Sequence, residues 1–135
     1  MSEYIAKFIT NLKMESTEHS DNGKWRIFSP LIYSSKVAKR LIVVPAGFIT
    51  DLASVPRLPF IYLVTGGKAN EASVIHDYLY VSKMVSRSMA DAVFREAMAA
   101  SGVSGWRRWM MWSGVRVGGG SAWDSHALPI DNITD

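Results

Sequence analysis

The sequence predicts one α+β domain, with a small antiparallel β-sheet in its first half and about three α-helices in its second half. Short runs of β-branched and aromatic residues, separated by turn formers, occupy about residues 3–64. Apolar residues recur at helical spacing over about 69–118. The length of 135 residues, with 48% hydrophobic and 20% charged residues, suits one hydrophobic core. The remaining residues, about 119–135, are expected to form an extended tail.

Four runs in the first half favour β-strands, namely residues 4–10, 25–28, 31–33 and 41–45. Asp21, Asn22 and Gly23 are typical turn formers, so they predict a hairpin between the strands on either side. Proline cannot donate a hydrogen bond to a sheet, so we expect strand ends, edges or turns at Pro30, Pro45, Pro56 and Pro59.

The second half predicts three helices, over residues 71–83, 88–101 and 104–117. Ser88, with Asp91 three residues later, resembles a capping arrangement at the start of the second helix. Gly102 is a natural stop for that helix, and Ser104 could cap the next one. Three consecutive glycines, 118–120, then end the helical pattern.

Composition and charge exclude several classes of protein. The chain has no cysteine, so it has neither a disulfide scaffold nor a thiolate zinc site nor a cysteine nucleophile. The formal net charge of +3 falls short of the dense basic surface of a dedicated nucleic-acid binder. No apolar run is as long as a membrane span, and the first residues lack the features of a signal peptide. We therefore expect synthesis in the cytoplasm as a soluble protein.

The first candidate site lies on the first predicted helix. His76 and Tyr80 are four residues apart and share a helical face, while Asp77 points about a quarter turn away. Histidine is the usual general base at neutral pH, and Asp91 on the next helix could fix its tautomer if the two helices are antiparallel. Asp77 could then hold a hard cation such as Ca²⁺. The alternative is structural, with a hydrogen-bonded edge of the core and Asp91 as a cap.

The second candidate is the segment 47–57, where polar residues interrupt an apolar sequence. The interpretation that we favour is a turn stabilised by side-chain hydrogen bonds. The functional alternative places Asp51 beside His76 as a further carboxylate and metal ligand, with Ser54 and Arg57 as binding residues. Ser54 as a nucleophile has little support, because the glycine pattern of a nucleophile elbow is missing.

The third candidate is the basic and aromatic sequence that begins the third predicted helix. Trp106, Trp109 and Met110 form one stripe, and Arg107 and Arg108 lie on other faces. We favour a core stripe with an exposed basic edge. Arginines interleaved with aromatic residues are also typical of surfaces that bind lipids or single-stranded nucleic acid. The two remaining histidines, His19 and His126, have no ligand spacing, and we assign them no role.

Several motifs in order resemble a phage and prophage family called domain of unknown function 1353. The motifs span residues 47–57, 76–80, 86–87, 90–94 and 112–118, and the resemblance extends from about residue 42 to 123. The resemblance implies a bacteriophage or prophage origin, among genes for virion structure or tail assembly. It implies no particular activity.

A second, more distant resemblance concerns the two helices alone. His76-Asp77-x-x-Tyr80, followed by Ala90-Asp91-x-x-Phe94, is similar to the active-site helices of secreted-type phospholipases A2. That resemblance implies His76 as the base, Asp77 as a Ca²⁺ ligand, Asp91 as the orienting carboxylate and Tyr80 as its hydrogen-bond support. Those enzymes differ in being mainly helical and in holding calcium with a glycine-rich loop before the His helix.

Three hypotheses follow. The first is a virion or tail-assembly component, non-enzymatic or with a vestigial site, that contacts other phage proteins. It would be made in the host cytoplasm and incorporated into the virion. The second is a metal-assisted hydrolase with His76 as base, used as the phage enters or leaves the cell, which implies contact with a membrane or cell envelope. The third is a small host-directed inhibitor. The modest charge disfavours nucleic acid as a partner, and the sequence leaves the oligomeric state open.

Overall fold

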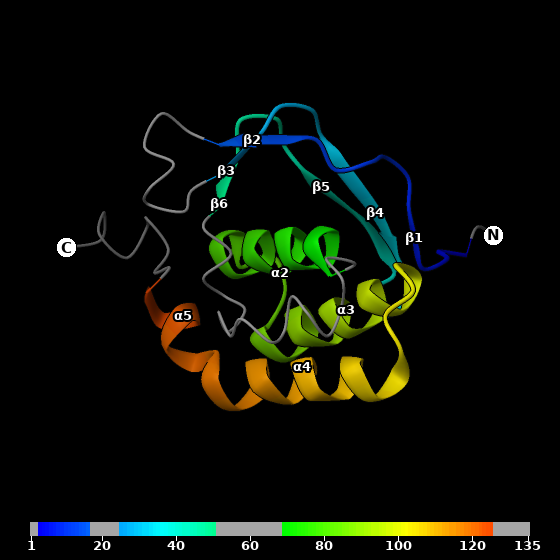
Figure 1. The fold of residues 1–135 in the computed structure, drawn as a ribbon, viewed down its shortest axis with the longest axis vertical. Coiled ribbons are helices and arrows are strands. Elements are labelled where there is room, and N and C mark those ends of the chain that lie inside the picture. The colour runs from blue at the N-terminus through cyan, green and yellow to red at the C-terminus, as the bar shows by residue number, and fades with distance from the viewer. Residues whose placement is uncertain (1–2, 17–24, 51–68, 126–135) are drawn as a thin grey trace.

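The computed structural model describes residues 3–16, 25–50 and 69–125. Within these ranges, antiparallel strands are followed by helices, which confirms the predicted α+β class. The strands are β1 (Lys7–Phe8), β2 (Met14–Ser16), β3 (Trp25–Ile27), β4 (Leu31–Ser35), β5 (Arg40–Val44) and β6 (Ile49–Thr50). The helices are α2 (Asn70–Ser82), α3 (Arg87–Ala100), α4 (Gly105–Gly118) and α5 (Gly120–Ser125). Figure 1 shows the strands on one side of the molecule, with α2 and α3 beneath them and α4 beyond α3.

The described strands form two small sheets, each with three strands. One has the order β1-β4-β5, and the other has the order β2-β3-β6. β4 and β5 pair over five residues, from Leu31 opposite Val44 to Ser35 opposite Arg40. β2 and β3 are antiparallel, with Met14 opposite Ile27, as expected of a hairpin. The turn formers predicted to join them lie outside the described residues. Residues 4–10 contribute only the two-residue strand β1.

The core lies between the sheets and the two inner helices. Ile42 and Val44 of β5 are fully buried on one face of their strand, while Leu41 and Val43, which alternate with them, are exposed. This alternation is what a strand with one face against the core requires. α2 and α3 contribute Ala72, Val74, Ile75, Leu79, Tyr80, Ala90, Val93, Phe94, Ala97 and Met98 to the core, and α4 adds Met111 and Val115. Burial of these apolar side chains fixes α2 and α3 beneath the strands.

Local hydrogen bonds fix both ends of α3, and the residue that caps its start differs from the prediction. The cap is Ser86, whose hydroxyl accepts a hydrogen bond from the backbone N–H of Met89. The predicted cap arrangement of Ser88 with Asp91 was therefore wrong. At the other end, the N–H of Val103 donates to the Met98 carbonyl, and Gly102 has a φ of +89°. This is a Schellman motif, and it confirms Gly102 as the stop.

Two further boundaries differ from the prediction or extend it. Ser104 is the N-cap residue of α4, although its side chain makes no capping hydrogen bond. Residues 120–125 form the short helix α5, so the first part of the predicted extended tail is helical. The chain resumes a helix after Gly119 because the glycines interrupt the pattern for only one residue. None of the helices in the described ranges is both long and apolar enough to pass through a bilayer.

Candidate functional site

His76 and Asp91 face each other across the α2–α3 pair. The Nε2 atom of His76 lies 2.6 Å from Oδ1 of Asp91, and both side chains are fully buried. α2 ends at Ser82 and α3 begins at Arg87, so the short connection turns the second helix back along the first. The two helices make extensive contact with each other. The predicted His–carboxylate pair is therefore present in the structure, inside the core.

Asp91 receives three hydrogen bonds, one each from His76, Tyr80 and Arg116. Oδ1 accepts from His76 and, at 2.7 Å, from the Tyr80 hydroxyl. Oδ2 accepts at 2.7 Å from Nη1 of Arg116 on α4. An ionised carboxylate is costly to bury unless charged or polar partners satisfy its oxygens. The partners of Asp91 come from α2 and α4, so this one carboxylate joins three helices. We call these four residues, together with Arg87, which donates a hydrogen bond to Tyr80, the Asp91 network.

Arg87 extends the Asp91 network to the end of α4. Its Nε donates to the Tyr80 hydroxyl at 3.2 Å, and its Nη2 donates to the carbonyls of Val115 and Arg116 at 2.8 Å each. The last carbonyls of a helix lack partners within the helix and carry partial negative charge. The guanidinium of Arg87 therefore caps the C-terminal end of α4 and holds the hydroxyl of Tyr80 at the same time.

The environment sets the protonation state of the pair. Burial lowers the pKa of His76, although the hydrogen bond and charge of Asp91 oppose this effect. Burial alone would raise the pKa of Asp91, but the hydrogen bonds from His76, Tyr80 and Arg116 lower it overall. Burial also raises the pKa of Tyr80. Asp91 is thus ionised at neutral pH and His76 is neutral, so His76 carries its proton on Nε2 and donates it to Asp91.

This tautomer decides what the imidazole could do. Because Nε2 is engaged by Asp91, a proton transfer to or from any other group has to use Nδ1. The ring is also held by aromatic neighbours, with its centroid 4.2 Å from that of Tyr80 and 4.7 Å from that of Phe94. The arrangement fixes both the tautomer and the orientation of the base, which general-base catalysis requires.

Asp77 lies next to His76 in sequence but has a different partner. Its Oδ2 accepts a hydrogen bond from the Thr50 hydroxyl at 2.5 Å, and both side chains are buried. This contact joins β6 to α2. Asp51, the second predicted metal ligand, lies outside the described residues. Among the residues that the structure describes, no group of three or more His, Asp or Glu side chains is placed to hold a metal ion. The Ca²⁺ role of Asp77 and Asp51 stays a prediction.

Gly119 is packed against the Asp91 network. A Cβ atom at this position would lie 2.4 Å from the Val115 carbonyl oxygen and 2.8 Å from the Tyr80 hydroxyl. Only glycine fits such a close approach without displacing its neighbours. Beyond it, Trp123 of α5 packs edge-on against the Tyr80 ring at 5.0 Å, and Lys83 donates to the Trp123 carbonyl at 2.7 Å. The chain after α4 therefore closes the end of the site where Tyr80 lies.

The other two candidate sites have different outcomes. Ser54 and Arg57, like Asp51, lie outside the described residues. On α4, the Trp106 and Trp109 side chains are 61% and 59% exposed, whereas Met111 and Val115 are buried. The interpretation of the tryptophan stripe as core was therefore wrong. The stripe exists, but the opposite side of the helix packs on the protein. Arg107 and Arg108 are partly exposed beside the stripe.

Sequence reasoning missed two arginines and a threonine of this site. Arg87 and Asp91 are four residues apart on α3, and that spacing was a usable signal for a shared face. Arg116 and Thr50 had no such signal, because each reaches its carboxylate from another element of the fold.

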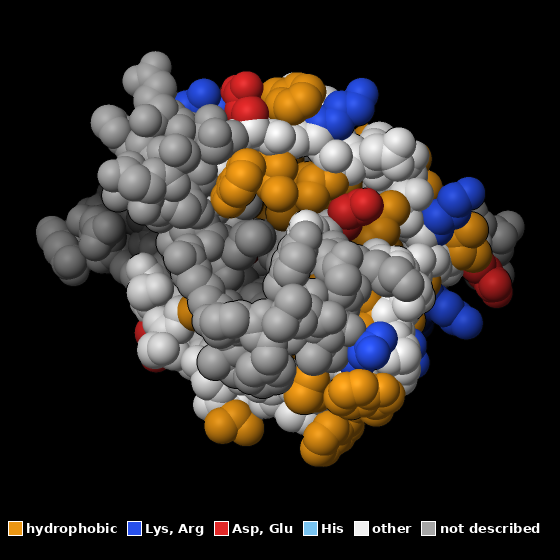
Figure 2. Space-filling model, in the orientation of Figure 1, with side chains coloured by type: hydrophobic (Ala, Val, Ile, Leu, Met, Phe, Trp, Pro, Cys, Tyr) orange, Lys and Arg blue, Asp and Glu red, His pale blue; other side chains and the backbone are white. Residues whose placement is uncertain are grey.

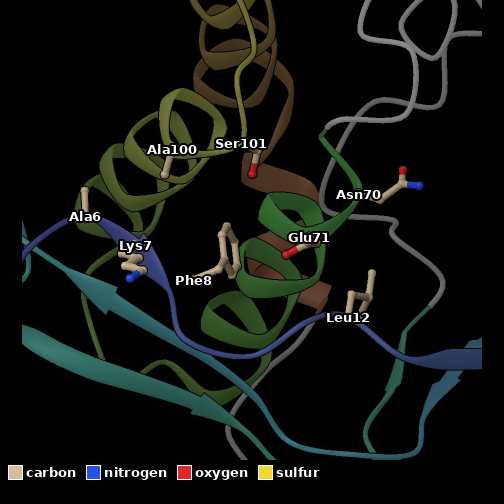
Figure 3. Close-up of a pocket in the computed structure, with 8 residues that line it drawn as sticks. All are labelled: Ala6, Lys7, Phe8, Leu12, Asn70, Glu71, Ala100 and Ser101. Atoms are coloured by element: carbon tan, nitrogen blue, oxygen red, sulfur yellow. The ribbon is translucent and has the colours of Figure 1, made fainter.

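A cavity of about 510 Å³ lies elsewhere in the molecule (Figure 3). It opens between β1, the start of α2 and the end of α3, and it is lined by Ala6, Lys7, Phe8, Leu12, Asn70, Glu71, Ala100 and Ser101. Burial raises the pKa of Glu71 there. None of these lining residues belongs to the Asp91 network, so among the described residues the cavity and the network are separate.

Comparison with known proteins identifies the family of the chain. No curated protein and no solved structure matches the chain. A family model matches residues 25–115, which include His76, Asp77, Tyr80 and Asp91 and make up more than half of the chain. The chain therefore belongs to the family described as "Protein of unknown function (DUF1353)".

Proposed function

We propose that the protein is a phage-encoded component of virion or tail assembly, and that the Asp91 network has a structural role in it. The observation that carries this proposal is the complete burial of the His76 and Asp91 side chains. A general base has to contact its substrate or the water molecule that it deprotonates. A side chain with no exposed surface does not do so in this conformation. The phage origin and assembly context follow from the sequence resemblance.

The contacts support a clamp rather than a reaction centre. Asp91 accepts from donors on α2 and α4, and Arg87 binds the carbonyls at the end of α4. Asp77 ties α2 to β6 through Thr50. Buried networks in which each donor has an acceptor give rigidity and a unique packing. A rigid helix block that presents fixed surfaces is what a component of an ordered assembly needs.

One specific observation favours a second candidate, a hydrolase in which His76 is the base. The Asp91 carboxylate holds Nε2 of His76, and Tyr80 donates to the same oxygen. These are the roles that the phospholipase A2 resemblance assigns to the three residues. The neutral ring would act through Nδ1, and the buried site would have to open for substrate. Asp77, adjacent to the base, would supply the carboxylate for a calcium ion.

His76→Gln separates the two candidates. The glutamine amide can still donate to Asp91, but it cannot act as a base. A phage that lacks the gene would be complemented with the parent or the variant, and particles and plaques would be counted. On the structural proposal, particle number falls only as far as stability falls, and the particles that form are infective. Normal particles that fail to infect, from a variant as stable as the parent, would contradict it and favour the hydrolase.

Tyr80→Phe serves as the matched control. It removes the hydrogen bond from Tyr80 to Asp91 and the one that Tyr80 accepts from Arg87, and it keeps both the aromatic ring and the His76–Asp91 pair. On either candidate, a modest loss of stability is expected, of about 1 kcal/mol. If His76→Gln and Tyr80→Phe reduce particle yield in proportion to their stabilities, the clamp accounts for both. Hydrolysis of phospholipid vesicles by the parent protein with Ca²⁺, abolished only by His76→Gln, would establish the second candidate.

A further inference from the structure

The solvent-exposed face of α4 is apolar, whereas an ordinary surface helix exposes polar side chains on that face. Trp106, Trp109 and Val117 are 61%, 59% and 89% exposed, respectively. With 100° between successive residues, these three lie on the side of the helix opposite Met111 and Val115, which are buried. We call Trp106, Trp109, Met110 and Val117 the outer face of α4. In Figure 1, α4 lies beyond α3 at the side of the molecule away from the strands.

Trp106 and Trp109 are the most exposed aromatic side chains among the described residues. Figure 2 shows large hydrophobic side chains protruding at the bottom of the molecule, where α4 lies in Figure 1, with basic side chains nearby. Soluble proteins rarely leave several large aromatic side chains on one helical face without a partner. Tryptophan has an apolar ring and one N–H donor, so it is suited to a boundary between an apolar and an aqueous phase.

The charged residues of α4 itself are all basic. Residues 97–123 contain no Asp or Glu, whereas they contain Arg107, Arg108 and Arg116. Within the part of the chain that the structure describes, Arg116 is the only arginine of α3 and α4 in an ion pair, and its partner is the buried Asp91. The guanidinium of Arg107 lies 5.2 Å from the Trp106 ring centroid, and that of Arg95 lies 5.5 Å from the Trp112 ring centroid. Arg95, Arg107 and Arg108 thus keep their charge available for an external anion.

We propose that the outer face of α4 docks onto an anionic lipid surface. Trp106 and Trp109 would enter the headgroup region, and the flanking arginines would contact the lipid phosphates. The shape favours a lipid surface because the face is a single convex helix, and none of the four residues of the outer face of α4 lines the described cavity. A nucleic-acid strand would need open aromatic faces within a basic groove, and Arg107 already stacks on the Trp106 ring.

Vesicle co-sedimentation tests this proposal with the full-length protein. The parent should bind vesicles of phosphatidylcholine and phosphatidylglycerol in equal amounts, bind vesicles of phosphatidylcholine alone much more weakly, and release at high salt. The combined variant Trp106→Ala and Trp109→Ala should lower binding to the anionic vesicles by roughly tenfold or more, because two interfacial anchors are lost. Arg107→Gln should lower it about fivefold, which is the effect of one basic residue near an anionic surface.

Matched variants on the strand side control for general loss of apolar area or charge. Leu41→Ala with Val43→Ala removes exposed apolar side chains from β5, and Lys13→Gln with Lys36→Gln removes two exposed charges. Neither pair should change vesicle binding by more than about twofold. The tryptophan variant should unfold at the same urea concentration as the parent, because its side chains contribute little to the core. That result ensures that lost binding is not lost folding.

Three outcomes would overturn the proposal. The first is equal binding of the parent to neutral and anionic vesicles, or binding that the tryptophan and arginine variants leave intact. The second is a dimer in sedimentation velocity that the tryptophan variant dissociates, with no vesicle binding by the parent, since the face would then be covered by a second copy. The third is binding of a single-stranded oligonucleotide, lost in the same variants, in the absence of vesicle binding.

Discussion

Two carboxylates on α3, Asp91 and Glu96, each accept three hydrogen bonds, but their partners differ in charge and burial. Asp91 is fully buried and accepts from an imidazole, a phenol and a guanidinium on neighbouring helices. Glu96 is half-buried and accepts from the Tyr33 hydroxyl, the Ser35 hydroxyl and the Val37 N–H, all in or just after β4. Asp91 therefore joins helices to helices, whereas Glu96 joins α3 to the sheet.

The difference in partners follows from how deeply each carboxylate is buried. A carboxylate at the edge of the core keeps contact with solvent, so neutral donors are enough for Glu96. A carboxylate inside the core has to be stabilised by a cation and by oriented hydrogen bonds, and Arg116 and His76 provide these for Asp91. The Asp91 network is for this reason the better candidate for a specialised site, and Glu96 is an anchor for the scaffold.

The largest expected effect comes from Asp91→Ala. The substitution leaves the buried side chains of His76 and Tyr80 and the partly buried guanidinium of Arg116 without their acceptor. Breaking a buried charge pair in this way typically costs about 3–5 kcal/mol, so urea unfolding should show a large loss in the free energy of unfolding. A loss below about 1 kcal/mol would show that water enters the network freely and that Asp91 resembles Glu96 after all.

Gly119→Ala should cause the next largest loss in the free energy of unfolding, because the added methyl group would clash with Tyr80 of the Asp91 network. The new methyl group would contact the Val115 carbonyl and the Tyr80 hydroxyl at distances too short for carbon. Overpacking of this kind costs about 1–3 kcal/mol. The controls are Gly118→Ala and Gly120→Ala, whose Cβ atoms would meet nothing within 4 Å. If all three substitutions have the same effect on unfolding, helix propensity rather than the contact with Tyr80 explains Gly119.

Glu96→Gln tests the second carboxylate of the comparison, the one with neutral donors. Glutamine keeps one oxygen acceptor, but it cannot accept all three hydrogen bonds that Glu96 accepts. Because these donors are neutral and the site is half-buried, we expect a loss of about 1 kcal/mol in the free energy of unfolding. The comparison would fail if Glu96→Gln were as destabilising as Asp91→Ala, since burial and charge would then not distinguish the two carboxylates.

The part of this site that was predictable from sequence is the part that depends on local geometry. His76 and Tyr80 share a helical face by their spacing, and a short link between two helices brings Asp91 opposite them. The class of the fold was predictable for the same reason, because the change from short β-branched runs to helical spacing is a local property. The Gly102 stop is local too, since it depends on one left-handed residue.

The rest depends on packing between distant segments. Arg116, Thr50 and Glu96 reach their partners across the fold, and no spacing along the chain indicates those pairs. The orientation of α4 was mispredicted because both of its sides are apolar, so periodicity alone did not show which side faces the core. Asp91 was a plausible helix cap in isolation, but Ser86 satisfies the backbone there, and Asp91 turns to His76 instead.

The smallest expected effect is the pH dependence of stability, and this effect is also the most specific to the Asp91 network. The pKa of His76 in the folded protein lies below its ordinary value of 6.5. As the pH falls through 6.5, the unfolded chain therefore takes up a proton that the folded protein does not, and the free energy of unfolding decreases. Asp91, with a pKa below its ordinary 3.8, adds a second loss in more acidic solution.

His76→Gln should remove the first of these losses and leave the second. One proton that differs between the two states changes the free energy of unfolding by at most about 1.4 kcal/mol per pH unit. Urea unfolding of parent and variant between neutral pH and the acid range would measure the difference in slope. His19 and His126 are present in both proteins, so they do not contribute to that difference. Identical slopes would mean that His76 is protonated as readily in the folded protein as in the unfolded chain, and the assignment of a neutral, Nε2-protonated ring would be wrong.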